Sequence, residues 1–278
     1  MVPAPLFAFG FGYVASELAR ILKAGGVSVA GTTRSEASAD LLRSNGWRAH
    51  IWPGEDVQPP SGAAWLISVP PDEHGCPVFR SFADRAATAS WIGYLSTTGV
   101  YGDLGGRWAF EETPLNPQSR EAINRAKAED QWLSAGASVF RLPGIYGPGR
   151  SPLERVREPG ARRIVKSGQV FSRAHVSDIA SALKLAIAKR THGAIFNICD
   201  DQPAPADQVL AYAASLLDLA PPPAVAFEDA NLSPAAQRFY AECKRVSNAK
   251  AKAVLGWRPR FPTYREGLLD CLQRAAST

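Results

Sequence analysis

The residues near the start of the chain that are best suited to chemistry are the glycines of FGFGYVAS. Gly10, Gly12 and Ala15 fit the pattern G-x-G-x-x-G/A, between an apolar segment and an amphipathic one. The first glycine allows a tight turn, the second lets the backbone approach a pyrophosphate, and the small third residue lets helix pack on strand. A purely structural turn is the alternative. The predicted phosphate-binding residues are Gly10, Phe11, Gly12, Tyr13 and Val14.

The end of the second apolar segment indicates which dinucleotide would bind. An NAD-preferring site usually carries an acidic residue there, which binds the ribose hydroxyls. This chain has Thr32, Thr33 and Arg34 instead. No carboxylate would repel a 2′-phosphate, and an arginine offers a planar set of donors for one. We therefore expect Thr33 and Arg34 to contact NADP in preference to NAD, although an exposed loop arginine is the alternative.

These residues require a parallel sheet to position them. Short apolar runs alternate with helical patterns through the first half of the chain, which is typical of right-handed crossovers with helices on both faces. The pattern predicts an α/β fold with a Rossmann-type, doubly wound parallel sheet. The expected strands are residues 5–9, 27–32, 47–52, 63–69, 90–97 and 137–144, and the expected helices lie within 13–25, 36–46 and 116–130.

After about residue 150 the pattern changes to short strand-like pieces mixed with helices. We interpret residues 1–150 as the NAD(P)-binding domain and residues 151–278 as a smaller α/β substrate lobe, partly interwoven with the first. This lobe should cover the carboxyl ends of the strands, where ligands bind in open α/β sheets. Its expected strands are 162–168 and 193–200, and its expected helices are 177–190, 205–219 and 263–276.

Composition excludes several classes of protein. Of the 278 residues 46% are hydrophobic and 21% are charged, which is ordinary for a globular chain, and a net charge of +5 without interleaved aromatic residues argues against nucleic acid. Four cysteines and four histidines are dispersed, so we expect neither a metal site nor a disulfide framework. We see no signal peptide and no apolar run of membrane length, so we expect a cytoplasmic protein. One arginine cluster, comprising Arg155, Arg157, Arg162 and Arg163, could meet a phosphate-bearing ligand or simply be solvated.

Several later motifs occur in a recognisable order. They are LSTTGVYGD (95–103), VFRLPGIYGPGR (139–150), RAHVSDIASALKLAI (173–187), GAIFNICDDQPAPADQVL (193–210) and SNAKAKAVLGWRPRFPTYREGL (247–268). Together they resemble the extended, or atypical, short-chain dehydrogenase/reductases, in particular the NAD(P)-dependent epimerase/dehydratase group. The resemblance implies hydride transfer between a nicotinamide cofactor and a small hydroxyl or carbonyl substrate, such as a sugar or sugar nucleotide.

The resemblance also implies roles for individual residues. In this family a Tyr and a Lys four residues apart on one helix face a Ser or Thr across the cleft. Here Thr97 matches the Ser/Thr and Lys127 matches the Lys, which holds the nicotinamide ribose, while Ile123 stands at the Tyr position. Asn124 or Arg120 could polarise an oxygen in its place. The segment with Pro143 borders the nicotinamide, and Ser68 completes the expected cofactor contacts.

Three hypotheses about function remain open at this point. The first is an oxidoreductase or epimerase-like enzyme with an altered proton donor. The second is a non-catalytic NADP(H)-binding regulatory protein, and the third is a scaffold or dimer partner. Family members often dimerise, so a homodimer is an expectation. Tyr101, Tyr146 and Trp257 are more simply packing aromatics, and Ser177 or Asp178 would cap the helix that follows His175.

Overall fold

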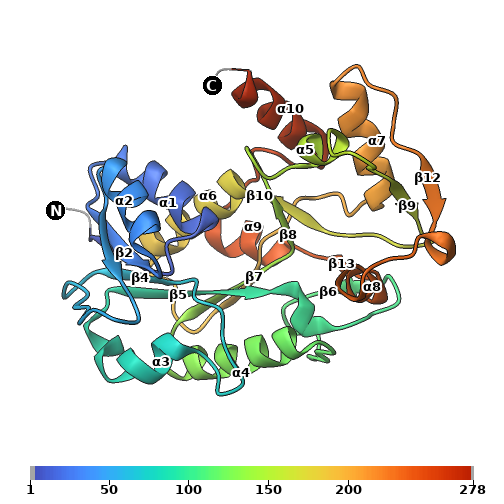
Figure 1. The fold of residues 1–278 in the computed structure, drawn as a ribbon. Helices are drawn as coiled ribbons and strands as arrows, with labels where there is room; N and C mark the ends of the chain where they lie inside the picture. The colour runs from blue at the N-terminus through green and yellow to red at the C-terminus, as the bar shows by residue number, and fades with distance from the viewer. Residues whose placement is uncertain (1–3, 277–278) are drawn as a thin grey trace.

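A seven-stranded parallel sheet lies at the centre of the computed structural model, which describes residues 4–276 (Figure 1). The strand order is β11-β7-β5-β4-β1-β2-β3, and all neighbouring strands are parallel. The predicted α/β doubly wound fold is confirmed. The strands are β1 (Leu6–Phe9), β2 (Val29–Thr33), β3 (Arg48–Ile51), β4 (Ala64–Ile67), β5 (Trp91–Thr97), β7 (Ser138–Leu142) and β11 (Ile195–Asn197).

Helices cover both faces of this sheet because successive strand residues point to opposite sides. In β1, Leu6 and Ala8 join the apolar core under α1 and α6, whereas Phe7 and Phe9 join the core under α3 and α4. Figure 1 shows α3 and α4 on one side and α1, α2, α6 and α9 on the other. These helices are α1 (Tyr13–Lys23), α2 (Glu36–Ser44), α3 (Pro77–Phe82), α4 (Arg120–Ser134), α6 (Val176–Lys189) and α9 (Ala249–Leu255).

A second group of elements packs around a separate apolar core beyond one end of the sheet, and we call it the C-terminal lobe. Its parallel strand pairs are β8 (Gly144–Tyr146) with β10 (Arg173–His175), and β9 (Arg163–Val165) with β12 (Ala224–Ala226). Its helices are α5 (Pro152–Val156), α7 (Ala206–Leu216), α8 (Pro234–Ala241) and α10 (Tyr264–Ala275). The remaining elements are the pair β6 (Trp108–Ala109) and β13 (Arg245–Val246), and the 3₁₀ turns η1 (Ala83–Thr88), η2 (Thr98–Tyr101) and η3 (Phe227–Asp229).

Two segments predicted for the smaller lobe belong instead to the first half of the fold, one as a strand of the main sheet and one as a helix that covers it. The strand in 193–200 is β11, which pairs with β7, and the helix in 177–190 is α6, which packs on α1. The reason is burial, because Phe196 of β11 is fully buried and stacks on Phe140 of β7 with ring centroids 5.7 Å apart. The two halves of the chain are therefore more interwoven than a division at residue 150 implies.

A buried ion pair fixes the position of α4. Arg141 of β7 donates to the Glu129 carboxylate of α4 at 2.7 Å, and the two side chains are 3% and 1% exposed. The same guanidinium donates to the Tyr101 hydroxyl at 3.0 Å and to the Glu111 carbonyl oxygen at 3.1 Å. Tyr101 in turn donates to the Asn197 side chain at 2.8 Å. Because Glu129 must point inward, the rotation of every other α4 residue about the helix axis is set.

Replacing Arg141 by Met should be strongly destabilising, because it leaves Glu129 buried without its cation. We expect a loss of about 3–5 kcal/mol in the free energy of unfolding, measured by urea denaturation. The double variant Arg141→Met, Glu129→Met should recover much of this loss, since it removes both charges and keeps the apolar volume. A single variant as stable as the wild type would contradict this account of α4.

Candidate functional site

The glycine turn after β1 forms one wall of a cavity of about 250 Å³. Gly10 has φ +84°, and its amide donates to Thr32 Oγ1 at 3.0 Å, while the Phe11 amide donates to the Thr32 carbonyl oxygen at 2.7 Å. These bonds hold the turn against the end of β2. Six predicted cofactor residues line this nucleotide cavity: Gly10, Phe11, Gly12, Thr33, Arg34 and Ser68.

The turn fits a pyrophosphate. Gly12 has φ −102°, and a Cβ added to it would meet no protein atom within 4 Å, so the missing side chain leaves open space beside the backbone. Tyr13 and Val14 follow as the first residues of α1, where backbone amides have no partner within the helix. Neither residue lines the cavity with its side chain. Trp52 and Pro53 do line it, and sequence reasoning missed them although they follow β3 at the same sheet edge.

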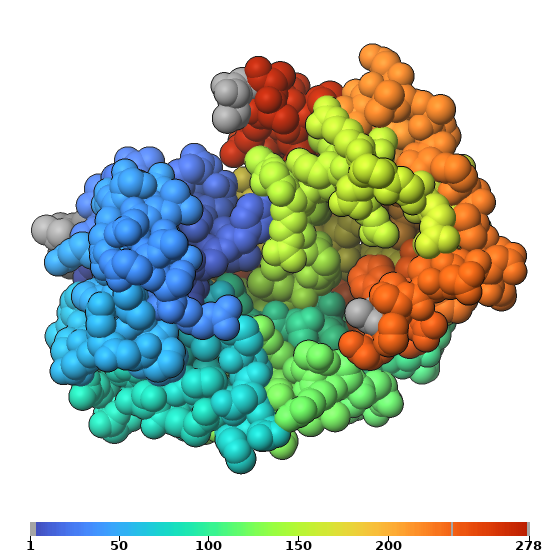
Figure 2. All heavy atoms as spheres, in the orientation of Figure 1, coloured from blue at the N-terminus to red at the C-terminus, as the bar shows by residue number. Residues whose placement is uncertain are grey.

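A second cavity, of about 520 Å³, lies at the carboxyl ends of β5 and β7. We call it the substrate cavity. Thr97 and Pro143 line it, together with Thr98, Ser119 and Glu121. The Thr97 Oγ1 accepts from the Gly99 amide at 3.1 Å, which leaves its own proton to donate. Figure 2 shows the molecule hollowed between the green segment of α4 and the lime and orange segments of the C-terminal half.

Lys127 is not brought to either cavity. Its side chain is exposed, and its Nζ donates to the Glu73 carbonyl oxygen at 3.3 Å, in the loop after β4. Ile123 is 40% exposed, and Arg120 forms an ion pair with Glu73. These three residues therefore lie on the outer side of α4. The inward rotation of Glu129 is the physical reason, because positions 123 and 127 do not share its face.

Arg125 and Glu121 lie one and two turns before Glu129, and each step of four residues turns about 40° around the helix. Ser119 caps the helix, its Oγ accepting from the Ala122 amide at 3.1 Å, and Glu121 lies in the first turn. Arg125 donates to the Leu95 carbonyl oxygen at 2.6 Å, and its guanidinium lies over the Tyr94 ring. Asn124 is buried and lines neither cavity. The helix thus presents Glu121 to the substrate cavity and Arg125 to β5.

Basic side chains line part of the substrate cavity. Arg173 lines it and also an adjoining cavity of about 360 Å³, which three arginines of the predicted cluster help to form, namely Arg155, Arg162 and Arg163. Arg157 of the same cluster is exposed and lines neither cavity. Phe171 and Phe239 stack at 4.2 Å between the two spaces. Arg173 uses Nη1 to bond the Phe171 and Ala204 carbonyl oxygens.

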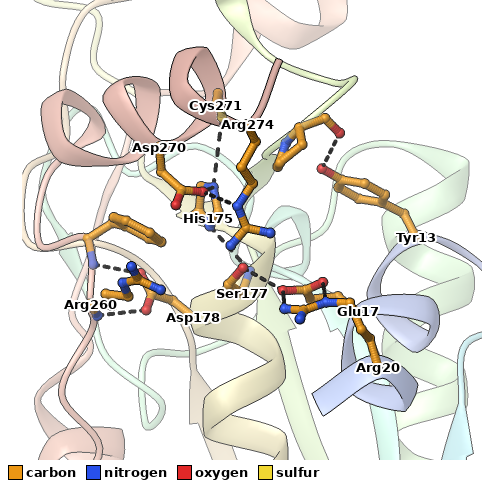
Figure 3. A network of polar contacts seen from close by, with 12 residues as sticks. Tyr13, Glu17, Arg20, His175, Ser177, Asp178, Arg260, Asp270, Cys271 and Arg274 are labelled. Atoms are coloured by element: carbon orange, nitrogen blue, oxygen red, sulfur yellow. Dashed lines mark hydrogen bonds and ion pairs between the residues drawn. The ribbon is translucent and has the colours of Figure 1, made fainter. Parts of the chain in front are cut away.

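The glycine turn is tied to the C-terminal lobe (Figure 3). The Tyr13 hydroxyl donates to the Pro148 carbonyl oxygen at 3.0 Å, and the Arg150 guanidinium lies over the Tyr13 ring. One turn further along α1, Glu17 accepts from the Ser177 hydroxyl of α6 at 2.6 Å. The side chain of Tyr13 therefore joins the two halves of the molecule, while its amide faces the turn.

The His175 side chain caps the N-terminus of α6, whereas the sequence predicted Ser177 or Asp178 as the cap. His175 Nδ1 accepts from the Ser177 amide at 3.3 Å. Asp178 instead accepts from the Arg260 and Phe261 amides at 2.7 and 3.1 Å, which holds the segment before α10 (Figure 3). The structural reading of Trp257 is confirmed, because its ring is 1% exposed and its Nε1 donates to Ser181 Oγ at 2.9 Å.

His175, Cys271 and Asp270 lie together but do not form a reactive group. The Cys271 Sγ is 3.8 Å and the Asp270 carboxylate 3.6 Å from His175 Nε2. Burial lowers the pKa of His175 to about 4 and raises the pKa of the Cys271 thiol to about 12. The imidazole and the thiol are therefore both neutral at pH 7, and neither lines one of the cavities described above.

Within residues 4–276 no cluster of three His, Cys, Asp or Glu side chains is placed to hold a metal ion. None of the helices described there combines the length and the apolar character that crossing a membrane requires.

The buried, neutral His175 should make the free energy of unfolding decrease as the pH is lowered. The unfolded chain binds a proton on this residue below about pH 6.5, while the folded chain binds it only near pH 4. The free energy of unfolding therefore decreases as the pH falls from about 6.5 to about 4. The loss should reach about 3 kcal/mol. His175→Asn keeps an acceptor for the Ser177 amide and should lack this decline when urea unfolding is compared at pH 7 and pH 4.5. Parallel pH profiles for the two proteins would contradict the prediction.

Comparison with known proteins agrees with this geometry. No family model matches the chain. A 3-diazoavenalumate denitrifying reductase from Streptomyces is 32% identical over 180 residues, which span 57% of this chain and 57% of that protein. Protein YeeZ of Escherichia coli is 26% identical over 234 residues, covering 77% of this chain and 84% of YeeZ.

Solved structures match over nearly the whole length. A functionally unknown conserved protein from Silicibacter pomeroyi is 45% identical, with a TM-score of 0.93 over 98% of this chain and 99% of that one. A dTDP-glucose 4,6-dehydratase from Bacillus anthracis in complex with NAD has a TM-score of 0.76 at 18% identity, over 99% and 97% of the two chains. RMD from Pseudomonas aeruginosa complexed with NADPH has a TM-score of 0.65 at 17% identity, over 97% and 98%. The chain thus belongs to one family with the Silicibacter protein, and it has the fold of the extended short-chain dehydrogenase/reductases that its motifs resemble.

Proposed function

We propose that the protein is an NAD(P)-dependent oxidoreductase, with reductase or epimerase-like chemistry on a hydroxyl or carbonyl substrate. The observation that carries this proposal is the placement of two cavities side by side at one sheet edge. The nucleotide cavity lies at the ends of β1, β2 and β4, and the substrate cavity lies at the ends of β5 and β7, where β4 and β5 are neighbours. A dinucleotide whose phosphates lie at Gly12 would extend its nicotinamide toward Thr97.

Different residues of the two cavities would bind the cofactor and the substrate. The dinucleotide, when bound, supplies or accepts the hydride. The open backbone at Gly12 and the first amides of α1 hold its phosphates, and Pro143 borders its nicotinamide. Thr97 donates to the reacting oxygen of the substrate and so orients it.

The proposed substrate is a small molecule with an anionic group at one end. Thr97 marks the reacting end of the cavity, whereas Arg173 and Arg238 line it elsewhere, and Arg155 and Arg162 follow in the adjoining space. Guanidinium groups bind phosphate and carboxylate groups well. A sugar nucleotide or a related sugar-like anion would suit this arrangement, with residues 151–278 supplying most of its contacts.

The enzyme is favoured over a non-catalytic NADP(H)-binding regulatory protein. Such a binding protein has no need of Thr97 in a cavity of about 520 Å³, and the Streptomyces relative is named a reductase. All four cysteines carry free thiols, which supports the cytoplasm as the place of action. The proposed homodimer would be tested by its mass in solution.

Titration with NADPH and NADH tests the proposal directly, followed by a panel of sugar nucleotides and small carbonyl compounds with cofactor oxidation as the readout. Dinucleotide binding together with turnover of at least one compound is the expected result. Tight binding with no turnover across the panel would support the binding protein instead, and no binding at all would exclude both.

Gly12→Ala should weaken dinucleotide binding without harming the fold. The backbone at Gly12 suits alanine, and the new methyl group would meet no protein atom within 4 Å, but it would stand where a pyrophosphate must approach. We expect an unchanged melting temperature and at least about a tenfold weaker affinity for NADPH in a fluorescence titration. Gly10→Ala is the contrasting variant, since φ +84° and the Val69 amide at 3.0 Å should make it unstable. Normal NADPH binding by Gly12→Ala would place the phosphates elsewhere.

Arg34→Ala should remove a preference for NADPH. Arg34 is exposed at the edge of the nucleotide cavity and lies beside Thr33. A hydrogen bond to a charged group contributes about 1.5–3 kcal/mol, so NADPH affinity should fall about tenfold or more while NADH affinity stays the same. Arg48→Ala, an exposed arginine at the start of β3, is the matched control. An unchanged ratio of the two affinities would assign no 2′-phosphate contact to Arg34.

A further inference from the structure

Glu121 is the acidic side chain of α4 that lines the substrate cavity. It lies in the first turn of the helix, two residues after the Ser119 cap, and it shares the cavity wall with Thr97, Thr98 and Ser119. Ala122, the next residue, lies against Gly99 in the turn after β5, where its Cβ is 3.6 Å from the place a Cβ on Gly99 would occupy. The start of α4 is therefore packed directly against the turn that carries Thr97.

The side chain of Glu121 is exposed, and it makes no hydrogen bond or ion pair with any residue that the structure describes. This distinguishes it from Glu242, the other carboxylate of the cavity wall, which is paired with Lys244. Its carboxylate belongs to the first turn of α4, where the helix dipole favours a negative charge. A group with no structural partner in a cavity of this size is available to a ligand.

The rotation of α4 places Glu121, and not Ile123, in the lining of the substrate cavity. Glu129 faces Arg141 in the protein interior. Arg125 and Glu121 precede it at intervals of four residues, each turned about 40° further around the helix, so Glu121 is exposed where it lines the cavity. The pair Glu121 and Arg125 thus has the spacing of the family's Tyr and Lys. The pair Ile123 and Lys127 has the same spacing but lies on the outer side of the helix.

We infer that Glu121 is the proton-transfer residue of the active site, acting on the substrate oxygen that Thr97 orients. This inference rests on the proposed function. Arg125 acts as a positioning residue, because its bond to the Leu95 carbonyl oxygen holds α4 against the strand that ends in Thr97.

The step balances in the direction of alcohol oxidation. The Glu121 carboxylate accepts the proton of the substrate hydroxyl, and the O–H electron pair forms the new C=O bond. The hydrogen on the same carbon leaves with its electron pair to NAD(P)⁺, which is the oxidant. The protonated Glu121 then releases its proton to water in the open cavity, and reduction is the reverse sequence.

A carboxylic acid and a phenol differ in acidity, with ordinary pKa values of about 4.3 and about 10. A tyrosine in this place would therefore need a higher pH to accept the proton of a substrate hydroxyl.

The first experiment compares Glu121→Gln with Asp130→Asn on a hydroxyl substrate found with the wild type and NADP⁺. Asp130 is an exposed carboxylate on the same helix and outside both cavities, so it is the matched control. Glu121→Gln should lower kcat by about 100-fold or more with an unchanged melting temperature and unchanged NADPH affinity, and Asp130→Asn should change none of these. Equal rates for Glu121→Gln and wild type would overturn the inference while leaving the proposed function standing.

The second experiment compares Glu121→Tyr with Ile123→Tyr. If Glu121 occupies the tyrosine position, Glu121→Tyr should retain activity and shift the pH dependence of oxidation to alkaline values, while Ile123→Tyr should behave as the wild type. The reverse pattern would show that Ile123 holds the position and would overturn the inference. A crystal structure with product and NADP⁺ gives a readout without turnover, in which the Glu121 carboxylate should lie within hydrogen-bond distance of the product oxygen.

Failure of the two proposals can be told apart. A wild type that turns over no hydroxyl or carbonyl compound overturns the oxidoreductase and Glu121's role with it. A wild type that turns over a substrate, with a Glu121 carboxylate remote from the reacting oxygen, overturns only the role of Glu121.

Discussion

The buried contact between Arg141 and Glu129 determines how the rest of the site is arranged. An ion pair that is almost wholly removed from water tolerates little displacement, because separating the two charges would leave each of them buried without its partner. It therefore locks α4 onto β7 at one rotation. Through Tyr101 and Asn197 the same network reaches η2 and β11, so one cluster of polar groups holds together the helix, the turn and two strands. The residues that face the substrate cavity follow from this rotation.

Much of the nucleotide-binding half was predictable from local pattern. The glycine turn, the threonines and arginine after β2, and Ser68 all follow apolar strands, and parallel strands bring their carboxyl ends to one sheet edge. Thr97 and Pro143 were indicated by the family motifs instead, and both stand where strands end, since Thr97 is the last residue of β5 and Pro143 follows β7. The predictions for the nucleotide cavity needed only the order of the strands and the residues after each one.

The orientation of α4 was not predictable in that way. The chain lacks the tyrosine that marks this helix in the family, and Lys127 is the only lysine between Val100 and Lys166. Lys127 was therefore expected in the site, but it lies on the outer side of α4, two residues from Glu129. The signal that could have corrected it was Glu129, a carboxylate whose partner Arg141 lies on the next strand. A helical pattern gives spacing, but burial of a charge depends on a tertiary partner. The place of β11 in the main sheet was missed for a similar reason, since a short apolar run predicts a strand but does not indicate which strand it pairs with.

The isolation of Glu121 from the rest of the protein has an evolutionary consequence. Its carboxylate supports no other side chain, whereas α4 is held by residues two turns away. Exchange of this one residue would therefore alter the chemistry of the cavity with little effect on folding. A lineage built on this scaffold could pass from one proton-handling group to another by single substitutions, with every intermediate still folded. The fold and the chemistry of the cavity could therefore change independently of each other.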